Sequence, residues 1–182
     1  MSNHVENFKE WISTIREDIG LLEVIVSSDA IERDARRYAA AALNYLVTRM
    51  DLVPDWEESI GMLDDAMVIR ICVELSSQNG LDSGLEGADH IVALGRLINE
   101  VKVVEEFLGK ELHSDLRDYC VKLTDAEVRG RGVATILESE EERTKLFAEV
   151  DADLKRVPPA SFSDAEAIEV KFKSYLRHKL TK

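Results

Sequence analysis

The spacing of the apolar residues near the N-terminus constrains the fold of this chain more than any other feature. Large apolar side chains follow one another there in alternating steps of three and four: Val5, Phe8, Ile12, Ile15, Ile19, Leu22 and Val26. This spacing places all of them on one stripe of an α-helix, whereas a strand would divide them between its two faces. Residues 5–26 are therefore predicted to form a long amphipathic helix.

The same helical spacing recurs along the rest of the chain. It predicts further helices over about 33–50, 62–77, 86–108, 112–123, 140–157 and 164–176, with a short helical piece after Thr124. No stretch alternates like a strand between hairpin turns, and no internal repeat is present. The pattern predicts an all-α bundle of about six to seven helices.

Short polar motifs predict where some of these helices begin and end. Asp29 with Glu32, and Ser139 with Glu142, have the spacing of capping boxes, in which side chains satisfy free amides of the first helical turn. Gly80 follows the third predicted helix, and glycine tolerates the left-handed backbone that often ends a helix.

The length of the chain favours one compact domain. A chain of 182 residues, of which 45% are hydrophobic, can bury a sizeable core. We assign residues 1–128 to a main helical bundle and residues 129–182 to C-terminal helices packed on the same body. The glycine-containing stretch 130–142 is where a C-terminal helical pair would hinge on the main bundle.

The net charge of −13 limits the partners of the chain. Phosphate backbones need a basic surface, and an acidic surface repels anionic lipid. We therefore expect no nucleic-acid partner, and peripheral membrane contact is disfavoured and is kept only as a third, weaker alternative. The longest weakly polar run, residues 39–47, is shorter than the ~20 residues that span a bilayer, so integral membrane insertion is excluded as well.

Two features favour a cytoplasmic location. Residues 1–6 carry neither the basic nor the apolar region of a secretory signal. Cys72 and Cys120 lie far apart in the sequence within apolar helical stretches, which is typical of reduced core thiols. No pattern in the sequence supports a disulfide between them.

The connection between the second and third predicted helices is rich in carboxylates. It runs through residues 51–56 and 61–65 and contains Asp51, Asp55, Asp64 and Asp65. The residue before Pro54 must be extended, and Gly61 permits a tight backbone just before the third helix. If the turn folds back, Asp51 or Asp55 approaches the Asp64–Asp65 pair.

This segment resembles the YkvA-like family, a bacterial domain of unknown function. The residues that carry the resemblance are Tyr45, Asp51, Leu52, Pro54, Asp55, Gly61, Asp64 and Asp65, with Arg36 upstream, within residues 36–73. The chain departs from the family at 57–59, and by Arg70 and Glu74 where relatives are apolar and membrane-associated. The resemblance implies a helical fold and brings no established reaction with it.

The acidic turn has three readings. In the first, its aspartates cap helices, because aspartate at a helix N-terminus satisfies free amides, and they pair with Arg36, Arg37, Arg49 or Arg70. In the second, Asp51, Asp55, Asp64 and Asp65 bind Mg²⁺ or Ca²⁺, which prefer oxygen ligands, although the spacing differs from that of an EF-hand. In the third, two carboxylates share a proton for catalysis. The structural reading is favoured, because helix ends recruit aspartates routinely.

Other candidate groups have simpler explanations. The four histidines are scattered without metal-ligand spacing. Residues 129–132, Arg-Gly-Arg-Gly, have the residue types of a phosphate loop but lack its preceding strand and its Gly-Lys-Ser/Thr ending. Their arginines are expected to face the carboxylates at 138–142. Trp11 lies off the apolar stripe of residues 5–26, and that stripe is a candidate dimer contact if the bundle leaves it exposed.

Taken together, these features favour a non-catalytic helical module that binds a protein partner or a second copy of itself. The alternative is a divalent-cation-binding protein, or a metal-dependent hydrolase, that uses the four aspartates of the turn. The sequence predicts no other cofactor and no catalytic residue.

Overall fold

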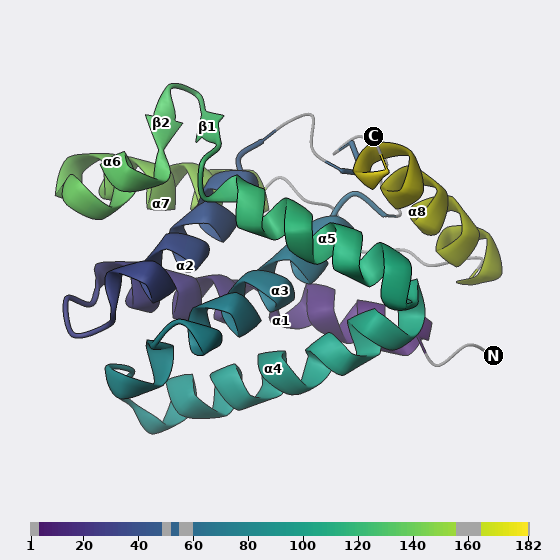
Figure 1. Cartoon of the computed structure of the whole chain (residues 1–182), viewed down its shortest axis with the longest axis horizontal. Coiled ribbons are helices and arrows are strands. Elements are labelled where there is room, and N and C mark those ends of the chain that lie inside the picture. The colour runs from purple at the N-terminus through teal and green to yellow at the C-terminus, as the bar shows by residue number, and fades with distance from the viewer. Residues whose placement is uncertain (1–3, 49–51, 55–59, 156–164, 182) are drawn as a thin grey trace.

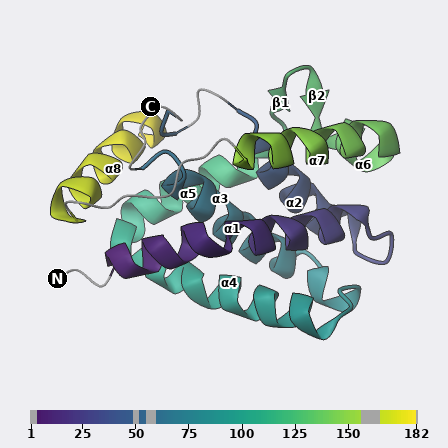
Figure 2. The same cartoon turned by 180° about the vertical axis from the view of Figure 1, so that it is seen from behind.

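The computed structural model describes residues 4–48, 52–54, 60–155 and 165–181, and within them the protein is an all-α bundle. Figures 1 and 2 show its helices from two opposite sides. The described helices are α1 (His4–Ser27), α2 (Arg33–Tyr45), α3 (Leu63–Gln78), α4 (Ala88–Leu108), α5 (Lys110–Leu123), α6 (Val133–Glu138), α7 (Glu140–Leu154) and α8 (Ala165–Leu180). A 3₁₀ turn, η1, covers Leu81–Ser83, and two short strands, β1 (Glu127–Val128) and β2 (Arg131–Gly132), form a hairpin.

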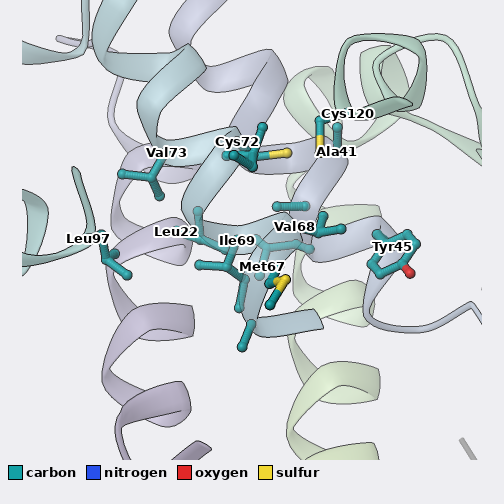
Figure 3. Close-up of a cluster of buried hydrophobic side chains, with 14 of the residues drawn as sticks. Leu22, Ala41, Tyr45, Met67, Val68, Ile69, Cys72, Val73, Leu97 and Cys120 are labelled. Carbon is teal, nitrogen blue, oxygen red and sulfur yellow. The ribbon is translucent and has the colours of Figure 1, made fainter. Parts of the chain in front are cut away.

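Helix α3 is the centre of the bundle. It contacts α1, α2, α4 and α5, and its side chains are buried on all sides rather than along one stripe. Figure 3 shows side chains of α3 together with buried side chains of its four neighbours: Met67, Val68, Ile69, Cys72 and Val73 of α3, Leu22 of α1, Ala41 and Tyr45 of α2, Leu97 of α4 and Cys120 of α5. A helix that is apolar all round is stable only inside such a shell.

The predicted stripe of α1 faces this core. Its members are buried, apart from the half-buried Ile12. Trp11 is 1% exposed although it lies off the stripe. The stripe is therefore unavailable as a dimer contact, which corrects that expectation.

Two glycines have structural roles around η1. Gly80 has a φ of 97° two residues after the end of α3, beyond the C-cap Asn79, which confirms the predicted helix end. Gly84 lies against the α1–α2 loop so closely that a Cβ on it would be 2.3 Å from the carbonyl oxygen of Ala30. No side chain fits there without a shift of one of the two backbones.

The structure corrects two predicted helical stretches. Helix α2 ends at Tyr45 instead of continuing to residue 50. The predicted helical piece after Thr124 is a turn that leads into the β1–β2 hairpin, whose tip has Arg129 at φ 52° and Gly130 at φ 77°. Helix α6 follows the hairpin directly and was not among the predicted helices.

The C-terminal helices pack on different parts of the bundle. Helices α6 and α7 contact each other and α2, whereas α8 contacts α5 (Figures 1 and 2). Phe172 of α8 meets Phe8 and Phe107 at ring-centroid distances of 6.4 and 6.1 Å. None of the helices in the described ranges is both long enough and apolar enough to span a membrane.

Candidate functional site

The structure describes one half of the predicted acidic turn. Asp64 and Asp65 lie in the first turn of α3, whereas Asp51, Asp55 and Arg49 lie outside the described residues. The predicted approach of the four aspartates to one another therefore remains a prediction. Within the described residues, no group of three or more His, Cys, Asp or Glu side chains is arranged to hold a metal ion.

Asp64 is fully buried and anchors the backbone of the turn. Its Oδ2 accepts a hydrogen bond from the Tyr45 hydroxyl at 2.5 Å and another from the amide of Val53 at 3.2 Å. The Tyr45 oxygen in turn accepts a hydrogen bond from the amide of Leu52 at 3.1 Å. We call Tyr45, Asp64 and these two amides the Tyr45–Asp64 clamp. It ties residues 52–53 to the end of α2 and to the start of α3.

Burial controls the charge of this carboxyl. It raises the pKa of Asp64 to about 7, although the hydrogen bond from Tyr45 and nearby backbone amides act to lower it. Among the described residues, Oδ1 of Asp64 has no directed hydrogen-bond partner. A carboxyl in such surroundings is substantially protonated near neutral pH, because desolvation disfavours the charged form. This state suits a structural anchor better than a ligand for a hard cation.

The predicted arginine partners of the turn are engaged elsewhere. Arg36 donates from Nε and Nη2 to the carbonyl oxygen of Val26 at 3.1 and 2.9 Å, and from Nη1 to Asp29 at 3.0 Å. It therefore closes the α1–α2 connection. Arg70 is fully buried and pairs with Asp18 of α1 and Glu100 of α4. Within the described part of the chain, both arginines thus bind carboxylates outside the acidic turn.

Arg70 belongs to a set of charged residues between α1, α3 and α4 that we call the buried ionic cluster: Asp18, Arg70, Arg96 and Glu100. Its Nη2 lies 2.7 Å from Glu100 and 3.6 Å from Asp18, and Arg96 binds Asp18 and lies 3.4 Å from Glu100. The Arg70 guanidinium also stands over the Trp11 ring, 4.3 Å from its centroid. Two positive and two negative charges balance, which is how a core tolerates buried ions.

Desolvation is the largest electrostatic effect in the buried ionic cluster. It raises the pKa of Asp18, against the opposite influence of Arg70 and Arg96. It lowers the pKa of Arg70, against the opposite influence of Glu100 and Asp18. The sequence patterns did not predict this cluster. The signals for it in the sequence were an arginine in the middle of the apolar run 66–73 and the i,i+4 spacing of Arg96 and Glu100.

The Arg-Gly-Arg-Gly segment forms the tip and second strand of the hairpin. Arg129 Nη1 and Arg131 Nη2 each lie 2.9 Å from Glu149 of α7, and Asn44 of α2 donates to the carbonyl oxygen of Arg131 at 3.0 Å. Arg131 also lies 4.0 Å from Glu142. The predicted partners at 138–142 are therefore mostly wrong: the arginines do face carboxylates, but the main partner is Glu149, and of the predicted set Glu142 alone, among the described residues, lies near Arg131. Arginines that already pair with carboxylates are poorly placed to hold a phosphate.

The two cysteines meet in the core. Cys72 of α3 and Cys120 of α5 are both buried and free, and Figure 3 shows their sulfur atoms turned toward each other. Burial raises the pKa of the Cys120 thiol, and its interaction with the Cys72 thiol raises it further. Protonated, fully buried thiols behave as small apolar side chains.

The outer face of α4 is the least covered apolar surface among the described helices. Ile91 is 56% exposed and Val92 is 72% exposed, near the N-terminal end of the helix. Ala88 and Gly95 are exposed on the same side, and a Cβ on Gly95 would meet nothing within 4 Å. We call these four residues the α4 face. Helix α4 itself lies along one edge of the bundle (Figures 1 and 2).

Comparison with known proteins adds no relative. No protein-family model matches the chain, and no curated protein or solved structure is significantly similar to it. The resemblance of residues 36–73 to the YkvA-like family therefore stays a prediction.

Proposed function

We propose that this protein is a non-catalytic helical module that binds another protein through the α4 face. The observation that carries the proposal is the exposure of Ile91 and Val92, two adjacent large apolar side chains on one helix face. Most large apolar residues of the described chain are buried. Val121 and Val170 are exposed as well, but they lie singly on α5 and α8, whereas Ile91 and Val92 are adjacent on α4. Exposed apolar side chains that gather in one place mark interaction surfaces, whereas scattered ones need no explanation.

The state of the other candidate groups supports a non-catalytic role. Asp64 anchors backbone amides of its own turn, and the ions of the buried ionic cluster are occupied by one another. The arginines of the hairpin pair with Glu149. These polar groups are thus bound mainly to one another and to the backbone. The α4 face, in contrast, presents two large apolar side chains that the described part of the chain leaves exposed.

We also keep two expectations as parts of this proposal. One is that residues 36–73 form a YkvA-like unit, which the clamp between Tyr45 and Asp64 supports because it joins two residues of that motif. The other is a cytoplasmic location, which the burial of Cys72 and Cys120 as free thiols supports.

Affinity capture with matched surface variants tests the interaction face. Val92→Glu places a charge on the α4 face, and Val170→Glu does the same on α8, where Val170 is 66% exposed. We expect the Val170→Glu protein to retain the partners of the wild type and the Val92→Glu protein to lose them. Identical sets of bound proteins for the wild type and Val92→Glu would overturn the proposal.

A divalent-cation site at the acidic turn is the second candidate, and the unpartnered Oδ1 of Asp64 favours it. Thermal unfolding in chelator and in millimolar Mg²⁺, Ca²⁺ or Mn²⁺ tests it for the wild type and for Asp64→Asn/Asp65→Asn. A bound ion stabilises the folded state by about 2.7 kcal/mol at a hundredfold excess over its dissociation constant. A melting temperature that no ion changes in the wild type would remove this candidate.

A further inference from the structure

We propose that Cys72 of α3 and Cys120 of α5 form a reversible intramolecular disulfide when a small peroxide oxidises the folded protein. The pair belongs to α3 and α5 and not to the α4 face, so it does not depend on the proposed function. The placement of the two sulfur atoms, the contacts that hold α3 against α5 and the burial of the thiols support this assignment.

The fold brings the only two cysteines of the chain together, although they lie on different helices and far apart in the sequence. Figure 3 shows the sulfur atoms of Cys72 and Cys120 turned toward each other, and a side-chain hydrogen bond joins the two thiols. Both side chains are fully buried, and both thiols are free. Thiols in such contact form a disulfide by losing their hydrogen atoms and closing to an S–S distance of about 2.05 Å.

Polar contacts beside the thiols hold α3 and α5 in this register. Arg117 of α5 binds both Glu74 and Gln78 of α3. Glu74 comes after Cys72 along α3. Its partner Arg117 comes before Cys120 along α5, which is the order expected of two antiparallel helices. These contacts fix the two helices independently of the thiols, so the sulfur atoms meet without a rearrangement of the fold.

The reaction is a two-electron oxidation of the thiol pair. One thiol, as its thiolate, attacks an oxygen of hydrogen peroxide; the O–O bond breaks, hydroxide leaves and takes up the released proton, and a sulfenic acid forms. The second thiol attacks that sulfur and displaces water, which forms the S–S bond. Two thiols and one hydrogen peroxide thus give one disulfide and two molecules of water. Exchange with a dithiol reductant reverses the reaction.

Burial determines which oxidant reaches the pair. It raises the pKa of the Cys120 thiol, although Arg117 acts to lower it, so little of this thiol is ionised at neutral pH. The side chains of Arg117 and Glu74 are 31% and 25% exposed, so solvent reaches the helix–helix contact three residues from Cys120. A small uncharged peroxide needs a smaller opening there than a bulky charged disulfide does. We therefore expect the pair to stay reduced in a reducing compartment and to oxidise slowly under sustained peroxide.

The disulfide joins the central helix of the bundle to α5. It closes a loop that contains η1 and the whole of α4. Closing a loop reduces the conformational freedom of the unfolded chain, so the oxidised protein should be the more stable form. Oxidation would therefore lock the packing of α3, α4 and α5.

Peptide mapping tests the bond. The folded wild-type protein is treated with hydrogen peroxide, denatured in the presence of an alkylating reagent and digested with trypsin. Because trypsin cuts after arginine and lysine, the two cysteines lie in the peptides 71–96 and 118–122. We expect these peptides to be joined, to lack two hydrogen atoms, and to separate when a reductant is added. Two alkylated cysteines after prolonged treatment would overturn the proposal.

Thermal unfolding tests whether the folded protein accommodates the bond. The oxidised wild type should melt at least about 5 °C above the reduced protein, and a reductant should reverse the rise. Cys72→Ala and Cys120→Ala are the controls and should show no such rise after peroxide. If these variants do not fold, the wild type before and after reduction still gives the comparison. An oxidised wild type that does not melt above the reduced protein overturns the proposal.

A comparison of two oxidants tests the access to the pair. The rate of thiol loss is measured with hydrogen peroxide and with oxidised glutathione, in native buffer and in urea. Folding should slow oxidised glutathione about tenfold more than it slows hydrogen peroxide, because the larger reagent needs a larger opening of the core. Equal slowing of both reagents would refute the small peroxide as the oxidant.

Discussion

Neutralising Asp64 should change how the stability of this protein depends on pH. In the folded state the buried carboxyl has its pKa raised from 3.8 to about 7. The folded protein therefore holds a proton at pH values where the unfolded chain has already released it. Stability from this group is fully present below about pH 4 and is lost as the pH rises toward about 7. Each pH unit in that window lowers the free energy of unfolding by about 1.4 kcal/mol, or about 4 kcal/mol in all.

Asp64→Asn removes the titrating group and keeps an oxygen that can accept from Tyr45 and Val53. Urea unfolding of both proteins at several pH values between 4 and 8 gives the free energy of unfolding at each pH. We expect the difference, wild type minus variant, to fall by about 4 kcal/mol from pH 4 to pH 7. Other titrating groups are common to both proteins and cancel in this difference. Two parallel curves would refute the reasoning, since they would mean that Asp64 ionises in the folded protein as easily as in the unfolded chain.

Three further predictions concern packing and use urea unfolding at neutral pH. Arg70→Ala leaves its two carboxylate partners in the buried ionic cluster undercompensated and should cost about 3–5 kcal/mol; a loss below about 1 kcal/mol would show that the cluster is not buried as described. Tyr45→Phe removes the hydroxyl of the Tyr45–Asp64 clamp and should cost about 1–3 kcal/mol, whereas an unchanged midpoint would contradict the clamp. Gly84→Ala should destabilise by about 1–3 kcal/mol because its Cβ meets a carbonyl oxygen at 2.3 Å, while the matched change Gly95→Ala should stabilise by about 1 kcal/mol; equal effects of the two would refute this assignment.

The capping motifs show how far local sequence rules reach. Ser139 accepts a hydrogen bond from the amide of Glu142 at 3.2 Å, so the predicted start of α7 is confirmed. Glu32 stands at the N-cap of α2 without a side-chain cap bond, so the predicted box with Asp29 is wrong there. Asp29 is engaged by Arg36 instead. The local capping motif therefore forms at the start of α7. At the start of α2 it does not form, and Asp29 instead makes an ion pair with Arg36.

The acidic turn shows where sequence reasoning stops. Its residue types predicted that Asp64 would have a structural role at a helix start, and the described hydrogen bonds agree with that reading. The same residue types predicted Arg70 as a partner of the turn, but Arg70 binds Asp18 and Glu100. In the sequence, the aspartates of the turn, Asp18 and Glu100 are all ordinary carboxylates. Nothing in the residues next to them shows which one Arg70 binds.

The sequence by itself determined the all-helical class, the long first helix and most of the helix boundaries. These follow from contacts between residues three or four apart, which every helix makes regardless of its surroundings. Only the tertiary structure decided that α3 is buried on all sides, that Arg70 joins α1 to α4, and that the α4 face is left uncovered while the stripe of α1 is hidden. Those outcomes depend on which helices pack together. Helix packing is decided by side chains tens of residues apart, which compete for burial and for charged partners. A short stretch of sequence does not include these competing side chains.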